Sequence, residues 1–258
     1  MSQRAEHEIT HGVFLARHNA EEIWGWSTPA GKLRAARRGS LIANGAGLRP
    51  GKRILEIGCG TGLFTERFAA SGATMVAVDI SADLLDQARR RGLPSPQVTF
   101  LEKRFEDCDV EGPFDGVIGS SILHHLDLAA AMARIFTLLN AGGVISFAEP
   151  NMLNPQILAQ KNVPLLKRLL GDSPDETAII RWRFARLLAN LGFQQISITP
   201  FDWLHPATPR SLIPAVRDMG RCLEGMPIAR EFAGSVYIRA RKPAPAGSPV
   251  VTSERVSP

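Results

Sequence analysis

The sequence predicts an α/β fold in which a mostly parallel, doubly wound sheet is covered by helices on both faces. Short apolar runs of strand length alternate with segments of helical periodicity through most of the chain. Several of these runs are apolar at nearly every position, which is typical of parallel strands that are buried on both faces. The chain has 258 residues, 45% of them hydrophobic, so it can bury the core of one such domain.

The elements of the expected sheet follow one another in a regular order. Strands are expected at 53–58, 74–79, 97–102, 114–120, 142–150, 194–201 and 233–242, with helices at 63–71, 81–91, 127–140 and 181–193. Ser81 suits the N-cap of the second of these helices, and Gly92 suits its end. This alternation indicates successive β–α units within a single seven-stranded sheet.

Three segments lie outside this regular pattern, which is expected to form one domain over residues 46–241. Residues 1–45 are expected to form an N-terminal helical lid. The segment at about 151–180 is interrupted by three prolines and is too long for a simple connection, so it is expected to cap the carboxyl edge of the sheet. Residues 242–258 are rich in Pro and Ser and are expected to be a disordered tail.

The composition argues against several classes of protein. The three cysteines form no C-x-x-C pair and the acidic residues lack the spacing of a divalent-ion site, so neither disulfides nor a bound metal is predicted. The net charge of +5 is dispersed, which argues against a nucleic-acid-binding protein. The sequence shows neither a secretory signal nor an apolar run of about 20 residues, so we expect a cytoplasmic protein without a membrane span.

A glycine-rich turn directly follows the first expected strand, in the run Glu56-Ile57-Gly58-Cys59-Gly60-Thr61-Gly62. Glycines let a ligand approach the backbone more closely than a Cβ permits, and the helix that follows offers free N–H groups. Asp79 ends the second strand, where a carboxylate can accept both hydroxyls of a ribose. The spacing G-x-G-x-G differs from the G-x-G-x-x-G of dinucleotide sites, and Glu56 would repel a pyrophosphate but suit a cationic ligand. A sulfonium nucleoside with an amino-acid tail fits both features, whereas the alternative is an ordinary turn.

Four motifs together resemble class I, Rossmann-like S-adenosylmethionine-dependent methyltransferases, in their small-molecule branch (methyltransferase type 11/12-like). ILEIGCGTG and VAVDIS resemble the first two motifs of the family, and FDGVIGSSILHHL and LNAGGVISFAEPN resemble its fourth-strand and fifth-strand motifs. They occur in the order of the family over residues 49–151. The resemblance implies S-adenosyl-L-methionine as cofactor, S-adenosyl-L-homocysteine as product, and a sheet whose last strand lies antiparallel between the fifth and sixth.

The same resemblance implies a cofactor site residue by residue. It places Glu56, Gly58, Cys59, Gly60 and Gly62 beside the methionine and ribose, Asp79 on the ribose hydroxyls, Ile80 against the adenine, and the backbone of Ser120 near the methionine part. After the third strand, the family often has Gly-Asp-Ala where this chain has Lys103-Arg104-Phe105. Arg104 and Phe105 are therefore the expected neighbours of the adenine, and Glu106, Asp107 or a backbone carbonyl would replace the aspartate of the family.

His124 and His125 are the first candidates for catalysis. In the family, the helix after strand four begins near the reactive methyl group, so a histidine there is suited to take a proton from an attacking hydroxyl. Adjacent residues on a helix point about 100° apart, so at most one of the two is expected to face the pocket, and its position in the motif favours His125. The alternative is that one histidine bonds locally and the other packs. Glu149, at the end of strand five, either orients an acceptor group or caps the following segment.

The expected acceptor-binding residues are Trp24, Trp26, Arg34, Asn151 and His205. The two tryptophans would close the mouth of the site, unless they belong to an amphipathic helix that docks on the core. Arg34 lies in a cluster of basic residues that either faces an anionic group, such as the carboxylate of the cofactor, or forms a solvated helix face. His205 lies in a run that is equally consistent with a packed turn.

These features predict methyl transfer to a small molecule, preferably to a hydroxyl oxygen of a partly hydrophobic metabolite that can also bear an anionic group. C- or N-methylation of a small metabolite is the alternative. Base-modifying relatives usually carry Asn/Asp-Pro-Pro-aromatic after strand four, where this chain has Gly119-Ser120-Ser121-Ile122, so nucleic acid is disfavoured as a partner. The intact glycine motif disfavours a non-catalytic S-adenosylmethionine-binding protein. The oligomeric state stays open, with a homodimer as one option.

Overall fold

The computed structural model describes residues 3–169 and 177–244. Its strands are β1 (Arg53–Ile57), β2 (Thr74–Asp79), β3 (Val98–Glu102), β4 (Phe114–Ser120), β5 (Leu139–Pro150), β6 (Gln194–Phe201) and β7 (Ser235–Arg241). Its α-helices are α1 (Gln3–Arg17), α2 (Ala20–Ile23), α3 (Pro29–Ala46), α4 (Leu63–Ala69), α5 (Ala82–Arg89), α6 (Leu128–Leu138), α7 (Pro155–Asn162), α8 (Pro164–Leu169), α9 (Arg181–Asn190) and α10 (Ile213–Gly225). Short 3-10 helices are η1 (Phe105–Asp107), η2 (Leu123–His125), η3 (Arg210–Leu212) and η4 (Ala229–Phe232).

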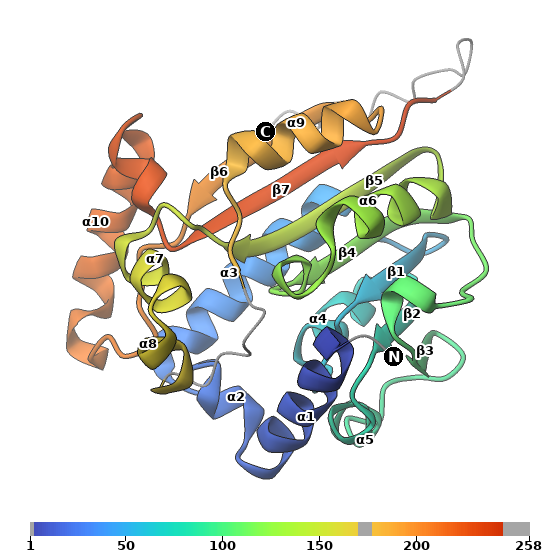
Figure 1. Cartoon of the computed structure of the whole chain (residues 1–258), viewed down its shortest axis with the longest axis horizontal. Coiled ribbons are helices and arrows are strands. Elements are labelled where there is room, and N and C mark those ends of the chain that lie inside the picture. Colours follow the sequence, from blue (N-terminus) through green and yellow to red (C-terminus); the bar gives the residue numbers. More distant parts are fainter. Residues whose placement is uncertain (1–2, 170–176, 245–258) are drawn as a thin grey trace.

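The strands form one seven-stranded sheet in the order β3-β2-β1-β4-β5-β7-β6 (Figure 1). Neighbouring strands from β3 to β5 pair in parallel, whereas β7 runs antiparallel between β5 and β6. The predicted fold class is therefore confirmed, including the position of the last strand. The strand order reverses between β1 and β4, and in open α/β sheets ligands bind outside the carboxyl ends of strands at such a point.

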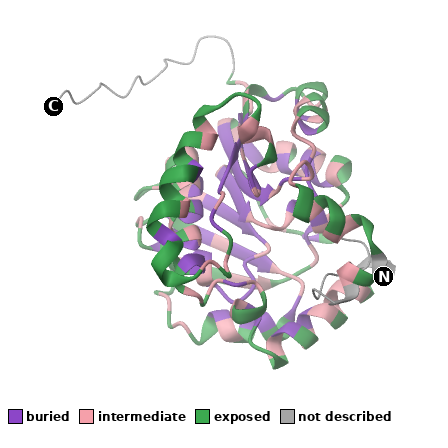
Figure 2. Cartoon of the chain, turned by 90° about the vertical axis from the view of Figure 1, so that its left-hand side faces the viewer, coloured by how far each residue is buried: buried purple, intermediate pink, exposed green. Residues whose placement is uncertain are grey.

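Helices cover both faces of the sheet, and Figure 2 shows the buried strands between helices whose outer sides are exposed. On one face α6 and α9 pack through side chains such as Met132 and Leu188. On the other face α3 and α4 contribute Ile42 and Phe68. Burying a side chain of this kind contributes about 1.5–3 kcal/mol. Two apolar layers therefore hold the carboxyl ends of the central strands in place.

Local capping signals set the starts of two helices that follow site residues. The hydroxyl of Ser81 accepts a hydrogen bond of 3.4 Å from the N–H of Leu84 at the start of α5, as predicted. Asp127 accepts hydrogen bonds of 3.0 and 3.1 Å from the N–H groups of Ala129 and Ala130, so α6 begins at Leu128. The end of β2 and the turn after β4 are thereby fixed relative to the helices that follow them.

The N-terminal segment has two roles rather than the single role of a lid. Figure 1 shows α1 and α2 at the carboxyl edge of the sheet, and α1 packs against α5. In contrast, α3 packs against β4, β5 and β7 and contributes to the core. The expected lid of residues 1–45 thus combines a cover with a core helix. Between β6 and β7, α10 is a further helix that the strand and helix signals did not indicate.

The segment after β5 forms α7 and α8, and Asn151 and Ile179 then form an isolated bridge that returns the chain to the edge of the sheet. The expected tail of residues 242–258 lies almost entirely outside the described residues. Of its described part, Lys242 donates hydrogen bonds of 2.7 and 2.8 Å to the carbonyls of Phe136 and Leu139. Within residues 3–169 and 177–244, no helix combines the length and the hydropathy needed to cross a membrane.

Candidate active site

The glycine turn after β1 faces a cavity of about 380 Å³ at the carboxyl edge of the sheet. Gly58 and Gly60 line this main cavity, and their φ angles of +67° and +51° are ones that L side chains rarely adopt. A Cβ on Gly58 would lie 2.4 Å from Ile122, and a Cβ on Gly60 would lie 3.2 Å from Trp24. The backbone conformation therefore favours glycine at both positions, and at Gly58 the contact with Ile122 also leaves no space for a Cβ.

Three other residues of the glycine motif occupy different surroundings. Cys59 lines the main cavity and is buried. Gly62 is the N-cap of α4, and a Cβ there would lie 3.0 Å from Ala88 of α5, so this glycine serves helix packing and is not among the described lining residues. Glu56 lies behind the turn with 2% of its surface exposed and does not line the cavity either. The positions of Gly62 and Glu56 therefore do not support the ligand contacts expected for these two residues.

Asp79 joins the end of β2 to the glycine turn. Its Oδ2 atom accepts a hydrogen bond of 2.7 Å from the N–H of Gly60, and its Oδ1 atom accepts one of 2.9 Å from the N–H of Ser81. Burial raises the pKa of Asp79, although these backbone donors favour the charged form. The carboxylate is therefore held in a fixed orientation at the cavity wall, with lone pairs left to accept from hydroxyl groups.

A smaller cavity of about 60 Å³ shares Gly58, Asp79, Ile80 and His125 with the main cavity. Ile80 and the buried Phe105 contribute apolar surface to its lining. Arg104 also lines it, but its guanidinium lies 3.3 Å from the carboxylate of Glu106 and 2.8 Å from that of Asp107. The loop after β3 thus forms part of this cavity, with an apolar ring where the family often has an aspartate.

Arg38 is a site residue that the sequence did not single out. It lies on α3, lines the main cavity, and is 2% exposed. Its Nη1 atom donates hydrogen bonds of 2.8 Å to the hydroxyl of Ser121 and 2.9 Å to the carbonyl of Ala148, and its Nη2 atom donates one of 2.6 Å to the hydroxyl of Ser235. Ser120, which also lines the cavity, accepts a longer bond of 3.3 Å from Nη1.

The charge of Arg38 is not balanced by an ion pair. No carboxylate of the described residues lies within ion-pair distance of its guanidinium, and its Nε atom has no hydrogen-bond partner among them. Burial, together with the positive charge of Arg34, lowers the pKa of Arg38 to about 10. Because a buried cation without a counter-ion is costly, this guanidinium is suited to receive an anion from the cavity.

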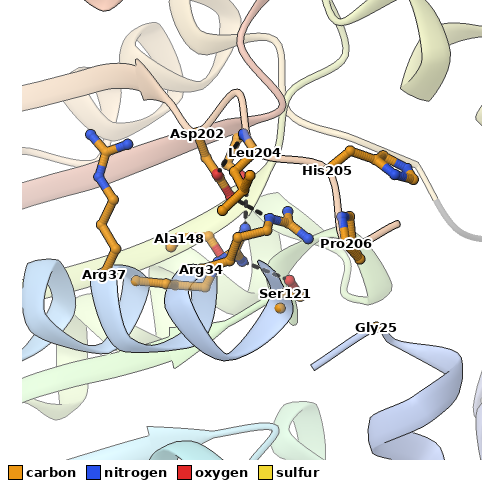
Figure 3. A network of polar contacts seen from close by, with 12 residues as sticks. Gly25, Arg34, Arg37, Ser121, Ala148, Asp202, Leu204, His205 and Pro206 are labelled. Atoms are coloured by element: carbon orange, nitrogen blue, oxygen red, sulfur yellow. Dashed lines mark hydrogen bonds and ion pairs between the residues drawn. The ribbon is translucent and has the colours of Figure 1, made fainter. Parts of the chain in front are cut away.

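Arg34 lies one turn earlier on α3 and also lines the main cavity. Its Nε atom donates a hydrogen bond of 2.8 Å to Asp202, at the end of β6, and Figure 3 shows this contact beside the loop that carries His205. His205 is exposed, bonds to Gln156 at 3.1 Å, and is not among the described lining residues. Burial and the charge of Arg34 lower the pKa of His205. Arg34 therefore borders the cavity as a paired cation, whereas His205 supports the base of α7.

The two tryptophans of the N-terminal segment both line the main cavity. Trp24, at the end of α2, lies against Gly60. Trp26 packs edge-on against Phe64, with ring centroids 5.6 Å apart, and the guanidinium groups of Arg34 and Arg38 lie 5.3 and 5.5 Å from its ring. Trp24 therefore covers the glycine turn, and Trp26 packs on the core and orients the two arginines.

The histidine pair lies in the 3-10 turn η2 and not in an α-helix, so the expectation that only one histidine faces the pocket is wrong. Both His124 and His125 line the main cavity, with ring centroids 4.2 Å apart. A tertiary contact causes this backbone conformation. Oε1 of Glu149 accepts hydrogen bonds of 2.9 and 3.0 Å from the N–H groups of Ile122 and Leu123. These bonds hold the turn open, and the chain enters α6 only after Asp127.

Glu149 and His124 form a buried pair at the ends of β5 and β4. The Nδ1 atom of His124 lies 2.7 Å from Oε2 of Glu149, and the side chains are 5% and 0% exposed. Burial alone would raise the pKa of Glu149, but the hydrogen bond and charge of His124 and the two backbone donors outweigh it, so the pKa lies below its usual range. The carboxylate therefore stays ionised and fixes the ring of His124.

Asn151 is buried beside this pair but is fully used by the backbone. Its amide nitrogen donates hydrogen bonds of 2.7 and 2.8 Å to the carbonyls of Glu231 and Ala233, and its oxygen accepts one of 3.2 Å from the N–H of Leu153. It is not among the described lining residues. Its expected contact with an acceptor stays a prediction, and its position indicates that it ties β5 to η4. Within the described residues, no cluster of His, Cys, Asp and Glu is arranged to hold a metal ion.

Comparison with known proteins identifies the class of the domain. Residues 54–143, from β1 into β5, match a family model described as a methyltransferase domain. This segment contains the glycine turn, Asp79 and the two histidines. Residues 54–143 are therefore similar to methyltransferase domains, and the resemblance drawn from the four sequence motifs is confirmed.

Individual relatives and solved structures are similar to parts of this chain. The ubiquinone biosynthesis O-methyltransferase of Xanthomonas campestris pv. campestris (strain B100) is 36% identical over 106 residues, which are 40% of this chain and 44% of that protein. The chain thus spans less than half the length of that relative in the match. Among solved structures, a SAM-dependent methyltransferase of Thermotoga maritima has a TM-score of 0.65 at 17% identity, covering 90% of this chain and 99% of that one. The N-methyltransferase NodS of Bradyrhizobium japonicum, in complex with S-adenosyl-L-homocysteine, has a TM-score of 0.56 at 14% identity, covering 84% and 89%.

Proposed function

We propose that this protein transfers a methyl group from S-adenosylmethionine to a hydroxyl oxygen of a small molecule. The observation that carries this proposal is that one cavity is lined by the turn of Gly58 and Gly60, by the carboxylate of Asp79 and by the guanidinium of Arg38. A nucleoside with an amino-acid tail requires this set: close approach to the backbone, an acceptor for ribose hydroxyls, and a cation for a carboxylate.

The residues present fit this cofactor part by part. The smaller cavity, lined by Ile80 and Phe105, suits a flat apolar ring such as adenine. Asp79 borders both cavities, where the ribose would lie. The unbalanced guanidinium of Arg38 would hold the carboxylate of the methionine part. The main cavity of about 380 Å³ also lies in the range of roughly 300–1,000 Å³ that small-molecule sites occupy.

When bound, the cofactor supplies a methyl group that its positively charged sulfur has already activated. The residues of the chain then have to align the acceptor, exclude water and take up a proton. Trp24 covers the glycine turn, and α1 contributes Glu8, Gly12 and Leu15 to the lining, so both exclude water from the cofactor end. Positioning of two reactants accounts for about 7–11 kcal/mol of a barrier in favourable systems.

His124 is the proposed general base, in place of the initially favoured His125. Because Glu149 holds Nδ1 of His124, the proton of the neutral ring is placed on Nδ1 and Nε2 becomes the basic nitrogen. His124 lines only the main cavity, whereas His125 lines both cavities and influences Asp79 electrostatically, so we assign His125 to the nucleoside end. A base of this kind contributes about 10²–10⁴-fold to the rate.

The acceptor end of the main cavity combines apolar and polar side chains. Trp26, Pro150 and Ile157 border it, together with Gln160 and Lys161 of α7. This lining suits a partly hydrophobic acceptor with a polar or anionic group. The printed name of the Xanthomonas relative, an O-methyltransferase, supports oxygen as the acceptor atom. A cytoplasmic location, the lack of a nucleic-acid partner and a homodimer remain predictions from the sequence.

Two measurements test this proposal. Calorimetric titration with S-adenosylhomocysteine should show stoichiometric binding, and the absence of binding would overturn the proposal. Incubation with methyl-labelled S-adenosylmethionine and a panel of phenols, alcohols and amines should then label hydroxyl-bearing acceptors. Labelling confined to amines would overturn the choice of oxygen while leaving the methyltransferase assignment intact.

A further inference from the structure

The N-terminal helix α1 contributes the carboxylate of Glu8 to the lining of the site. Oε2 of Glu8, on α1, lies 2.9 Å from Nδ1 of His125, in the turn after β4. The side chains of Glu8 and His125 are only 15% and 18% exposed. Both residues line the main cavity and the smaller cavity. The pair therefore lies at the junction of the two cavities, although more than a hundred residues separate its members in the sequence.

The second half of α1 packs against α5 and α2. Gly12 packs so closely on Ser81 that a Cβ would lie 2.5 Å from the serine hydroxyl. Leu15 forms a small buried cluster with Leu84 and Ala20, and Gln87 donates a hydrogen bond of 3.2 Å to the carbonyl of Ala16. Glu8 thus links the first half of α1 to a different part of the site, the turn that carries the two histidines.

We propose that Glu8 is a positioning residue: by holding the ring of His125, it fixes α1 over the junction of the two cavities and retains the bound nucleoside. This inference rests on the proposed function, because a cofactor that occupies both cavities would lie beside this junction. The helix and the ring then form a latch that closes over the cofactor, and release requires the Glu8–His125 contact to break.

The surroundings of His125 make this latch sensitive to pH. Glu8 approaches the ring from α1, Asp79 from β2 and His124 from the same turn, and Lys103, Arg104 and Glu106 line the far side of the smaller cavity. Among the described residues, the carboxylate of Glu8 lies within ion-pair distance of this ring. A protonated ring would attract the carboxylate of Glu8 more strongly than a neutral ring, because the two groups then carry opposite charges. Dissociation of the ligand is therefore expected to accelerate as pH rises through the titration of the ring.

The test measures how fast S-adenosylhomocysteine dissociates, by stopped-flow tryptophan fluorescence, because Trp24 lies against Gly60 of the site. Glu8→Gln and His125→Gln are each expected to accelerate dissociation about tenfold, since each removes one partner of a partly buried ion pair. The double variant should be no faster than either single variant, and Glu8→Asp should restore part of the effect. Glu6→Gln, which neutralises an exposed carboxylate on the same helix, is the matched control.

Two further readouts separate positioning from a general loss of structure. The wild-type rate should increase with pH, whereas the rate of Glu8→Gln should not. In hydrogen exchange, the ligand should protect residues 3–17 of the wild type more than those of Glu8→Gln. If the wild type does not bind S-adenosylhomocysteine, the proposed function fails. If it binds but Glu8→Gln releases the ligand at the wild-type rate, or Glu6→Gln releases it equally fast, the latch alone is wrong.

Discussion

The Nδ1 atom of His124, in the turn after β4, lies 2.7 Å from Oε2 of Glu149, at the end of β5. The other oxygen of the same carboxylate accepts hydrogen bonds from the N–H groups of Ile122 and Leu123. One buried side chain thus shapes the backbone of the turn and fixes the ring that the turn carries. An arrangement of this kind holds one tautomer of a histidine, as a general base requires.

His124→Gln is expected to lower kcat by about 10²–10⁴-fold while the affinity for S-adenosylhomocysteine stays unchanged, because only proton transfer is lost. Steady-state kinetics and calorimetry measure these two quantities. His18→Gln, at an exposed position after α1, is the control and should keep wild-type kinetics. A His124→Gln variant with wild-type kcat would show that the acceptor loses its proton without this histidine.

Asp79→Asn should weaken the binding of S-adenosylhomocysteine roughly ten- to hundredfold, because hydrogen bonds to a charged group are lost. Asp83→Asn removes an exposed carboxylate on α5 and should bind like the wild type. Calorimetry of the three proteins measures the difference. Equal affinities for Asp79→Asn and the wild type would exclude Asp79 from the ribose contact.

Arg38 is expected to distinguish ligands with and without an amino-acid tail. Arg38→Lys keeps the charge but loses the planar fork, so S-adenosylhomocysteine should bind about tenfold more weakly. Methylthioadenosine has no carboxylate and should bind both proteins equally. Arg37→Lys, on the outer side of α3 where the guanidinium pairs with Glu224, should change neither affinity. An equal loss for both ligands in Arg38→Lys would indicate that Arg38 only supports the fold.

The sheet was predictable because its signal is local. TMVAVD is apolar at nearly every position and ends in a single carboxylate, and β2 with Asp79 lies there as expected. The glycine turn was equally visible, since three glycines at this spacing follow a buried strand. The roles of the three glycines were less predictable. Gly62 could face either the cavity or Ala88, and the packing of α4 on α5 decides between the two.

The parts that sequence reasoning missed depend on contacts between distant residues. Ala35, Arg38, Ile42 and Ala46 lie on the buried side of α3 at helical spacing, and this spacing is the signal that would have indicated a buried arginine. An arginine in the middle of an apolar stripe is readily taken as a break in that stripe. The 3-10 turn at His124 has no comparable local signal, since its cause is Glu149, which follows about 25 residues later.

Glu56 provides a test of how burial behind the glycine turn affects stability. Burial raises its pKa to about 8 from the usual value of 4.5, so the folded protein holds this proton more tightly than the unfolded chain. Unfolding therefore releases a proton between these two pH values, and the free energy of unfolding should fall as pH rises through this window and level off above it. Glu56→Gln cannot titrate and should lack this slope.

The comparison needs only thermal unfolding of the wild type and Glu56→Gln from pH 5 to pH 8. The Tm of the variant is expected to rise relative to that of the wild type as the pH increases, because only the wild type then has to take up a proton on folding. For a chain of this size, about 1 kcal/mol corresponds to roughly 2–4 °C in Tm, so the effect is measurable. Asp83→Asn, an exposed acidic residue on α5, should keep a constant difference from the wild type over the same range. A constant difference for Glu56→Gln as well would mean that Glu56 is ionised in the folded protein throughout, and the buried position would then have to admit water.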